Sequence, residues 1–169
     1  MSLSDEALNA KLATLKLLVL DVDGILTDGG LYYTESGEIL KKFNVKDGLG
    51  IKRLIRAGVE VAIISANSSE ATLHRAARLN VEHVFINAKD KLAILKTLCS
   101  QLNIELYQVA SMGDDLSDLP VMQAVGCPMT VADAMPENIA CALYVTQKGG
   151  GQGAVREVCD RIISSQQLG

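Results

Sequence analysis

The chain has few aromatic residues: it contains no tryptophan, and aromatic side chains make up only 4% of its 169 residues. Hydrophobic residues nevertheless account for 49% of the sequence. The core must therefore consist mainly of leucine, isoleucine, valine and alanine, a composition typical of parallel strands covered by helices. The length is enough for one hydrophobic core and too short for two, so we expect a single domain over residues 1–169.

The chain also lacks an excess of basic residues and a long apolar run. Its net charge is -4 and its isoelectric point is about 5.2, which excludes the basic surface of a protein that binds nucleic acid or anionic membranes. No stretch approaches the roughly 18 apolar residues of a membrane span, and no basic region precedes an apolar one at the N-terminus. The composition favours a small diffusible partner over nucleic acid or a membrane.

Cysteine and histidine are scarce. The four cysteines form no C-x-x-C pair, and the two histidines have no partners at the spacing of metal ligands. Free thiols buried in the core are the favoured interpretation, with metal ligation as the alternative. Unpaired thiols predict a reducing compartment, the cytoplasm.

Short apolar runs alternate with segments of helical periodicity along the chain. Each run ends near Gly, Ser, Asn or Asp, which favours strands. Expected strands cover residues 16–22, 59–65, 82–86, 106–112 and 127–132, and expected helices fall within 48–58, 68–80 and 90–103. This alternation predicts an α/β fold with a doubly wound parallel sheet, which binds ligands beyond the carboxyl ends of its strands.

Two segments depart from this alternation. Residues 30–44 alternate apolar and polar side chains about a Ser36-Gly37 turn, which predicts a β-hairpin inserted directly after the first strand. Residues 147–167 contain a glycine-rich loop followed by an amphipathic helix. From the residues alone, this loop could be a flexible connector.

The first expected strand runs into two aspartates. Residues i and i+2 of a strand lie on one side, so Asp21 and Asp23 can face a shared site, and Gly24 allows a sharp backbone turn after them. Two carboxylates this close repel each other unless a cation lies between them. Magnesium binds one or two carboxylates together with water and a phosphate oxygen. The two aspartates alone fit a magnesium site and, equally well, acidic residues at a strand end without a metal.

A second acidic cluster follows another expected strand, where Asp114, Asp115 and Asp118 occur within five residues. Because the carboxyl ends of parallel strands share one edge of the sheet, the two clusters are expected to converge. Ser65 ends the second strand at an expected helix N-terminus, where its hydroxyl can donate to an anion. Lys91 opens the next expected helix and adds a positive charge to this group.

The segments "DVDGILTDG" (21–29) and "GDDLSDLPVM" (113–122), with Ser65 and Lys91 between them, resemble the four motifs of the haloacid dehalogenase phosphatase superfamily. The match extends over nearly the whole chain. The resemblance implies a Rossmann-like fold and a magnesium-dependent phosphate monoester hydrolase that forms an aspartyl phosphate.

More narrowly, the hairpin that replaces a cap domain, "KDGLGIKRL" (46–54) and "GGGQGAVREVCD" (149–160) resemble the 3-deoxy-D-manno-octulosonate 8-phosphate phosphatases. The resemblance implies a sugar phosphate substrate in lipopolysaccharide synthesis and a homotetramer with the hairpins at its centre, where a neighbouring subunit helps to close each active site. Exposed Tyr32 and Tyr33 would fit such an interface. It also implies that the glycine loop is part of the substrate enclosure.

The resemblance further assigns roles to the acidic residues. Asp21 is the expected nucleophile, and Asp23 is expected to protonate the departing alkoxide and then to deprotonate the attacking water. Magnesium is expected on Asp21, the backbone carbonyl of Asp23, and Asp114. Asp115 is expected to contact the residues that bind the metal, and not the metal itself.

The remaining expected site residues concern the phosphate. By resemblance, Ser65 and Lys91 hold its non-bridging oxygens, and Lys89 is a less favoured candidate for the same role. Asp118 is expected to orient Lys91 or the metal ligands, or else to be an acidic residue early in a helix that the helix dipole favours.

One departure from the family pattern concerns specificity. The family usually has Thr-Gly-Arg where this chain has Ser65-Ala66-Asn67, so an arginine that could bind a sugar carboxylate or phosphate is replaced by an uncharged amide. Asn67 and Arg75 are candidate substrate-binding residues. Arg75 and Arg78 either compensate for the missing arginine or are solvated helix charges.

Three alternatives remain. A nine-carbon acid-sugar phosphate is another candidate substrate. The chain could be a weakly active assembly module like those fused to sialic-acid cytidylyltransferases. A receiver domain of a signalling relay also has an acidic magnesium pocket in a doubly wound fold, but its phosphoacceptor aspartate ends the third strand, and residues 81–87 offer no aspartate.

Overall fold

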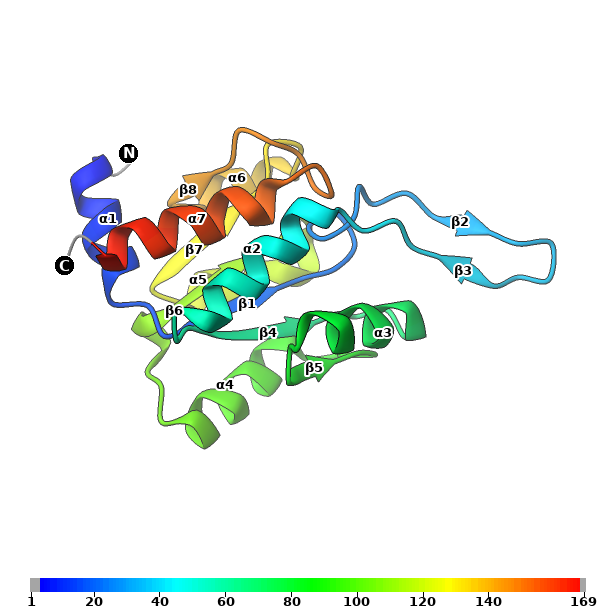
Figure 1. Cartoon of the computed structure of the whole chain (residues 1–169), viewed down its shortest axis with the longest axis horizontal. Coiled ribbons are helices and arrows are strands. Elements are labelled where there is room, and N and C mark those ends of the chain that lie inside the picture. The colour runs from blue at the N-terminus through cyan, green and yellow to red at the C-terminus, as the bar shows by residue number, and fades with distance from the viewer. Residues whose placement is uncertain (1–3, 168–169) are drawn as a thin grey trace.

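The computed structural model describes residues 4–167, and its centre is a six-stranded parallel sheet (Figure 1). The strands are β1 (Leu17–Leu20), β4 (Glu60–Ile64), β5 (His83–Phe85), β6 (Val109–Met112), β7 (Cys127–Thr130) and β8 (Tyr144–Val145). Their order is β5-β4-β1-β6-β7-β8, so the chain winds outward in both directions from β1. The expected doubly wound α/β fold is confirmed.

Helices cover both faces of the sheet. One face carries α1 (Asp5–Ala13), α2 (Val45–Arg56), α3 (Glu70–Leu79) and α7 (Ala154–Gln167), and the other carries α4 (Lys91–Leu102) and α5 (Leu119–Ala124), against which α6 (Pro136–Cys141) packs. Leu18 and Leu20 point into the first core, whereas Leu17 and Val19 point into the second. Because β1 is buried on both faces, its sequence is an uninterrupted apolar run, and its carboxyl end has a fixed position.

Side-chain caps mark where α2 and α4 begin. Asn44 caps α2 by accepting from the backbone N–H of Lys46 at 2.8 Å, and Asp90 caps α4 by accepting from that of Ala93 at 2.9 Å. Such caps satisfy backbone donors that have no partner within the helix. The Asp90 cap makes Lys91 the first residue of α4, as expected from the sequence.

The structure adds elements that the sequence pattern did not indicate. The strand β8 has two residues and α5 and α6 have six each, too short for a clear period. In α1 only Leu8 and Leu12 are buried, so its apolar stripe is weak. The expected strand at 106–112 begins only at Val109, because Leu106–Gln108 forms a 3₁₀ turn closed by a capping box.

The expected hairpin is present and projects from the body of the domain (Figure 1). It consists of β2 (Tyr32–Tyr33) and β3 (Ile39–Leu40), which pair antiparallel, and its turn contains Gly37 with a φ of 86°. Tyr33 and Leu40 are 62% and 56% exposed. The hairpin therefore presents large apolar side chains to solvent within a single chain.

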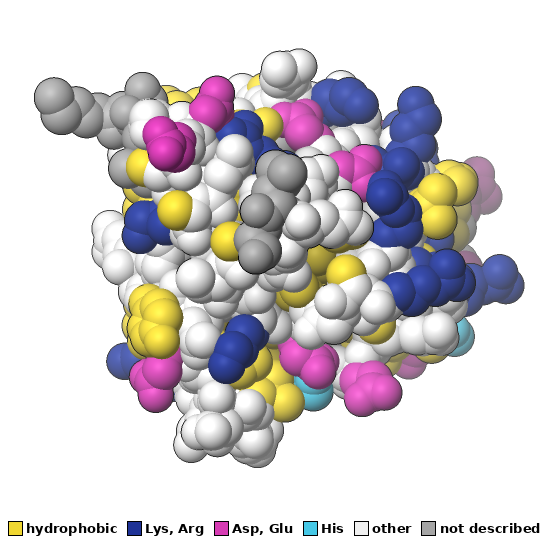
Figure 2. Space-filling view, turned by 60° about the vertical axis from the view of Figure 1, so that its left-hand side comes forward, with side chains coloured by type: hydrophobic (Ala, Val, Ile, Leu, Met, Phe, Trp, Pro, Cys, Tyr) yellow, Lys and Arg dark blue, Asp and Glu magenta, His cyan; other side chains and the backbone are white. Residues whose placement is uncertain are grey.

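The face of the molecule near the two termini differs from the hairpin in that charged side chains, not large apolar ones, cover much of it (Figure 2). There, many Lys and Arg side chains gather along the right-hand side of the view, acidic side chains lie beside and below them, and the hydrophobic ones form small separate groups. Arg53 of α2 and Arg156 of α7 both pair with Asp160. Among the helices of residues 4–167, none has the length and apolar character to cross a membrane.

The glycine loop before α7 packs tightly on the loop that follows β1. Gly150 donates its N–H to the Asp133 carboxylate at 2.9 Å, and Gly151 donates to the carbonyl of Ile25 at 3.0 Å. A Cβ on Gly150 would lie 1.8 Å from the carbonyl oxygen of Gly24. Contacts this close exclude a flexible connector, and they brace the segment that carries the first acidic motif.

Gly150→Ala should therefore destabilise the protein by at least about 2 kcal/mol, because the new methyl group overlaps backbone that cannot rotate away. Gly37→Ala is the matched control: nothing lies within 4 Å of its Cβ, so only its left-handed φ opposes the change, at about 1 kcal/mol. Urea unfolding of both variants measures the difference. A larger loss in Gly37→Ala than in Gly150→Ala would contradict this packing.

Candidate active site

The two acidic clusters meet beyond the carboxyl ends of β1 and β6. These strands are neighbours, with Leu20 paired with Met112, and the N–H of Asp21 continues the ladder to the Met112 carbonyl at 3.1 Å. Asp21, Asp114 and Asp118 each place a carboxylate oxygen within 4.8 Å of the other two. The topology thus brings together residues separated by more than 90 positions.

Lys91 lies at the centre of this cluster. Its ammonium donates to Asp21 at 2.8 Å and to Asp118 at 2.6 Å, and the three side chains are at most 10% exposed. The other oxygen of Asp118 accepts from the backbone N–H groups of Asp114 and Asp115 at 3.2 and 3.4 Å. Asp118 therefore fixes both the lysine and the backbone of the second acidic motif.

The site contains more negative than positive charge. Burial raises the pKa of Asp114 to about 7, and the charges of Asp21 and Asp118 add to this rise. Burial and Asp118 raise the pKa of Asp21 to about 6 against the opposing effect of Lys91. Burial lowers the pKa of Lys91, but the two carboxylates outweigh it, and the net pKa is raised. The lysine stays charged, and it pairs with only two of the three carboxylates.

The cluster is suited to a divalent cation. One carboxylate oxygen of Asp114 is buried without a hydrogen-bond partner. A Cβ at Gly24 would lie 1.9 Å from the other oxygen of Asp114, so only glycine leaves room for that carboxylate. Carboxylate oxygens are the donors that magnesium prefers. Asp21 and Asp114 therefore fit magnesium, with Asp118 committed to Lys91.

A polar cavity of about 370 Å³ opens above the cluster, a size that fits a small ligand. Its lining residues are Asp21, Asp23, Ser65, Ala66, Asn67, Lys91, Asp114, Asp115 and Ser117. The sequence predicted all of these as site residues except Ala66 and Ser117. It predicted Asp115 as a residue that supports the metal ligands. Ser117 was missed because a single serine between acidic residues carries no distinguishing pattern.

Ser65 and Asn67 line the cavity, as expected. Ser65 does not lie at a helix N-terminus, where it was expected. Helix α3 begins only at Glu70 with Ser69 as its N-cap residue, since residues 65–69 form a loop. The Ser65 hydroxyl oxygen accepts from the Asn67 N–H at 3.2 Å, and the Asn67 side-chain oxygen accepts from the Ser69 N–H at 2.9 Å. The loop's own hydrogen bonds thus orient both side chains.

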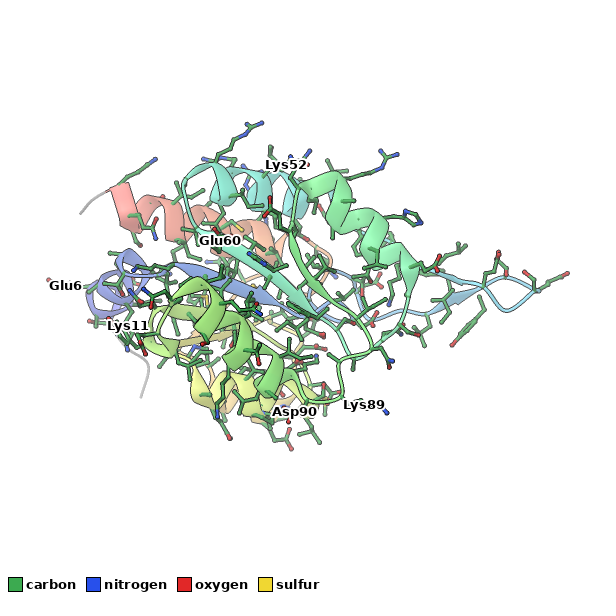
Figure 3. All side chains as sticks on the ribbon, turned by 90° about the horizontal axis from the view of Figure 1, so that it is seen from below. Glu6, Lys11, Lys52, Glu60, Lys89 and Asp90 are labelled. Carbon is green, nitrogen blue, oxygen red and sulfur yellow. The ribbon has the colours of Figure 1, made fainter. Side chains whose placement is uncertain are left out.

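Two other candidate cations are not among the residues that line the cavity. Arg75 donates to the backbone carbonyl of Asn44 at 3.0 Å and lies 5.6 Å from the centre of the Phe43 ring. Burial lowers the pKa of Arg75. Lys89 is exposed and points outward from the loop before α4 (Figure 3). Arg75 therefore connects α3 to the entrance of α2.

The structure adds a cation that the sequence did not reveal. Lys41, directly after β3, forms an ion pair with the Asp23 carboxylate, and its side chain is only 1% exposed. The next residue, Lys42, pairs with Asp28 at 3.0 Å and is 63% exposed. Two consecutive lysines in an exposed hairpin read as solvated charges, and nothing in their spacing marks one of them as buried.

Comparison with known proteins agrees with this geometry. Residues 83–157, which contain Lys91 and the second acidic cluster, match the family of haloacid dehalogenase-like hydrolases. Together with the parallel sheet and the acidic site beyond its central strands, this match defines a hydrolase of that class.

Full-length relatives narrow the assignment. The 3-deoxy-D-manno-octulosonate 8-phosphate phosphatase KdsC of Escherichia coli is 45% identical over 93% of this chain and 84% of that protein. The chain belongs to this family of phosphatases. The crystal structure of the phosphatase from Yersinia pestis is 43% identical, with a TM-score of 0.94 over 98% of this chain and 89% of that one.

A further solved relative contains ligands. The phosphatase from Moraxella catarrhalis was solved in complex with magnesium, phosphate and 3-deoxy-D-manno-octulosonate (KDO). It is 39% identical, with a TM-score of 0.94 over 97% of this chain and 94% of that one. That protein binds a metal ion, an inorganic anion and a sugar acid on the same fold.

The raised pKa of Asp114 predicts how stability depends on pH. The folded protein holds a proton on Asp114 up to about pH 7 that the unfolded chain releases near its ordinary carboxyl pKa, so stability falls as the pH rises toward 7. In the presence of a chelator, Asp114→Asn should therefore raise the Tm at pH 8 and have a smaller effect at pH 5.

Differential scanning calorimetry at both pH values measures this change, with Asp115→Asn as the matched control because Asp115 is exposed. Added Mg²⁺ should raise the Tm of the wild type at pH 8 and that of Asp114→Asn less, since binding to the folded state stabilises it. Equal Tm shifts of Asp114→Asn at pH 5 and pH 8 would contradict the buried-charge account.

Proposed function

We propose that the protein hydrolyses 3-deoxy-D-manno-octulosonate 8-phosphate to the free sugar acid and phosphate, with Mg²⁺ as cofactor, in lipopolysaccharide synthesis. The observation that carries the proposal is the cluster of Asp21, Asp114 and Asp118 beneath a polar cavity, with Lys91 paired to Asp21 and Asp118. The similarity to 3-deoxy-D-manno-octulosonate 8-phosphate phosphatases supports this substrate.

The reaction begins at Asp21. One of its oxygens attacks the phosphorus, and the bond between phosphorus and the sugar oxygen breaks, which gives an aspartyl phosphate. Asp23 gives its proton to the departing alkoxide and then takes one from the water that hydrolyses the aspartyl phosphate. Lys91 holds the Asp21 carboxylate in place at 2.8 Å, so the nucleophile is oriented before substrate arrives.

The remaining residues serve the phosphate and the metal. Lys91 and Ser65 bind the non-bridging oxygens as charge redistributes. Asp21, the backbone carbonyl of Asp23, and Asp114 hold Mg²⁺, which offsets the charge between nucleophile and phosphate when it is bound. Asp118 orients Lys91. Asp115, at the rim of the same cavity, is assigned a supporting role beside the metal ligands.

A nine-carbon acid-sugar phosphate is the second candidate substrate. Asn67 takes the place of the family's arginine, and its side-chain oxygen is already engaged with the Ser69 N–H. Arg75 is bound to a backbone carbonyl rather than to the cavity. The carboxylate, which both sugars carry, must then be recognised by other groups.

Phosphate release from a panel of sugar phosphates tests the proposal. We expect Mg²⁺-dependent hydrolysis with a preference for the eight-carbon acid, no release with a chelator, and a loss of at least about a thousandfold in Asp21→Asn. Asp28→Asn, in the same loop, is the matched control and should retain activity. Preference for a nine-carbon acid would favour the second candidate, and no release from any phosphate would favour an assembly module.

We also propose that the protein is a homotetramer assembled through its hairpins, with a neighbouring subunit closing each site. Exposed Leu31, Tyr32, Tyr33 and Leu40 on the hairpin support this arrangement, since an apolar surface of this kind usually marks an interface.

The three buried thiols, with a fourth that is partly buried, support a cytoplasmic location.

Light scattering after size-exclusion chromatography tests the assembly. Tyr33→Glu should lower the mass below that of a tetramer, because a charge in an apolar interface is unfavourable. Tyr107→Glu, at a tyrosine that is 67% exposed on a different part of the surface, should leave the mass unchanged. A monomeric wild type would refute this assembly.

A further inference from the structure

The hairpin contributes one side chain to the catalytic acid–base residue. The Lys41 ammonium pairs with a carboxylate oxygen of Asp23, and this lysine is 1% exposed, whereas the Asp23 side chain is 31% exposed. The more accessible carboxylate is therefore held by the more deeply buried cation. Lys41 lies 18 positions from Asp23 along the chain, so the contact forms only when the chain returns from the hairpin to the loop after β1.

A structural role alone explains this burial poorly. Taking an ammonium out of water is unfavourable, and pairing with a carboxylate offsets that loss only in part. The adjacent Lys42 already connects the same hairpin to the same loop through Asp28, without burial. The pair of Lys41 with Asp23 therefore includes an unfavourable desolvation of the ammonium, which the exposed pair of Lys42 with Asp28 avoids.

We propose that Lys41 is a positioning residue that fixes the Asp23 carboxylate toward the reacting atoms. The proposal rests on the proposed function, in which Asp23 exchanges a proton first with the leaving oxygen and then with water. A proton donor or acceptor works only within hydrogen-bond reach of its partner. Without Lys41, the partly exposed carboxylate turns into solvent, and both transfers slow while substrate binding is retained.

A double-mutant cycle tests whether Lys41 acts through Asp23. Lys41→Met should lower kcat about tenfold to a hundredfold, part of what general acid–base catalysis typically supplies, with KM nearly unchanged. In an Asp23→Asn background the same change should lower kcat less than about twofold, because the residue it positions is gone. Lys41→Arg should restore part of the rate.

The matched control is Lys42→Met, which removes an ion pair between the same two segments without touching Asp23. It should keep kcat within about twofold of the wild type. Additive losses in the double-mutant cycle would overturn the proposal, and so would a raised KM with unchanged kcat, which would make Lys41 a substrate-binding residue.

Leaving groups provide a second readout. A p-nitrophenolate leaves without a proton, whereas an alkoxide needs one, so Lys41→Met should reduce kcat/KM for p-nitrophenyl phosphate less than for an alkyl phosphate. This constant reports the steps up to cleavage of the ester. Equal losses on both esters would show that Lys41 acts only on the fold.

The test remains distinct from the choice of substrate. If the wild type hydrolyses another phosphate ester instead of the eight-carbon sugar, the proposed substrate is wrong, and the cycle is measured on that ester. If it hydrolyses none, a crystal structure of Lys41→Met decides: the proposal expects the Asp23 carboxylate to turn into solvent, and an unmoved carboxylate overturns it.

Discussion

Repulsion among three closely spaced carboxylates, two of which belong to buried residues, is the constraint on which this structure depends. Asp21 and Asp114 follow the two central strands of a parallel sheet, and Asp118 completes the cluster. Like charges this close are unfavourable in a buried site, and one lysine, Lys91, offsets only part of that charge. A divalent cation would neutralise the remaining negative charge. Because binding relieves the repulsion present in the metal-free protein, that repulsion favours metal binding.

The rest of the fold holds this cluster rigid. The strand β1 is buried on both faces, which fixes where Asp21 emerges, and the loop after it is covered by Gly150 and Gly151 from the other end of the chain. The hairpin adds Lys41 to the same loop. Segments from three parts of the sequence therefore restrain the short stretch on which the proposed chemistry takes place.

The sequence predicted the fold class and most of the cavity lining, because the strands are apolar runs and the acidic motifs sit directly at their ends. It failed where position depends on tertiary folding. Lys41 resembles any surface lysine until the chain that returns from the hairpin brings it to Asp23, and β8 is too short for a pattern. The helix expected within residues 68–80 is present as α3, which begins at Glu70, but Ser65 lies before it in a loop and not at its N-terminus.

The central claim is that Asp21 receives the phosphoryl group while a cation balances the cluster. Acid quenching of the wild type during turnover of a sugar phosphate, followed by peptide mass spectrometry, tests it most directly. The account predicts one phosphoryl group on the peptide that contains Asp21, present with Mg²⁺ and absent with a chelator. A phosphoryl group on any other residue, or one that forms equally with a chelator, would contradict it.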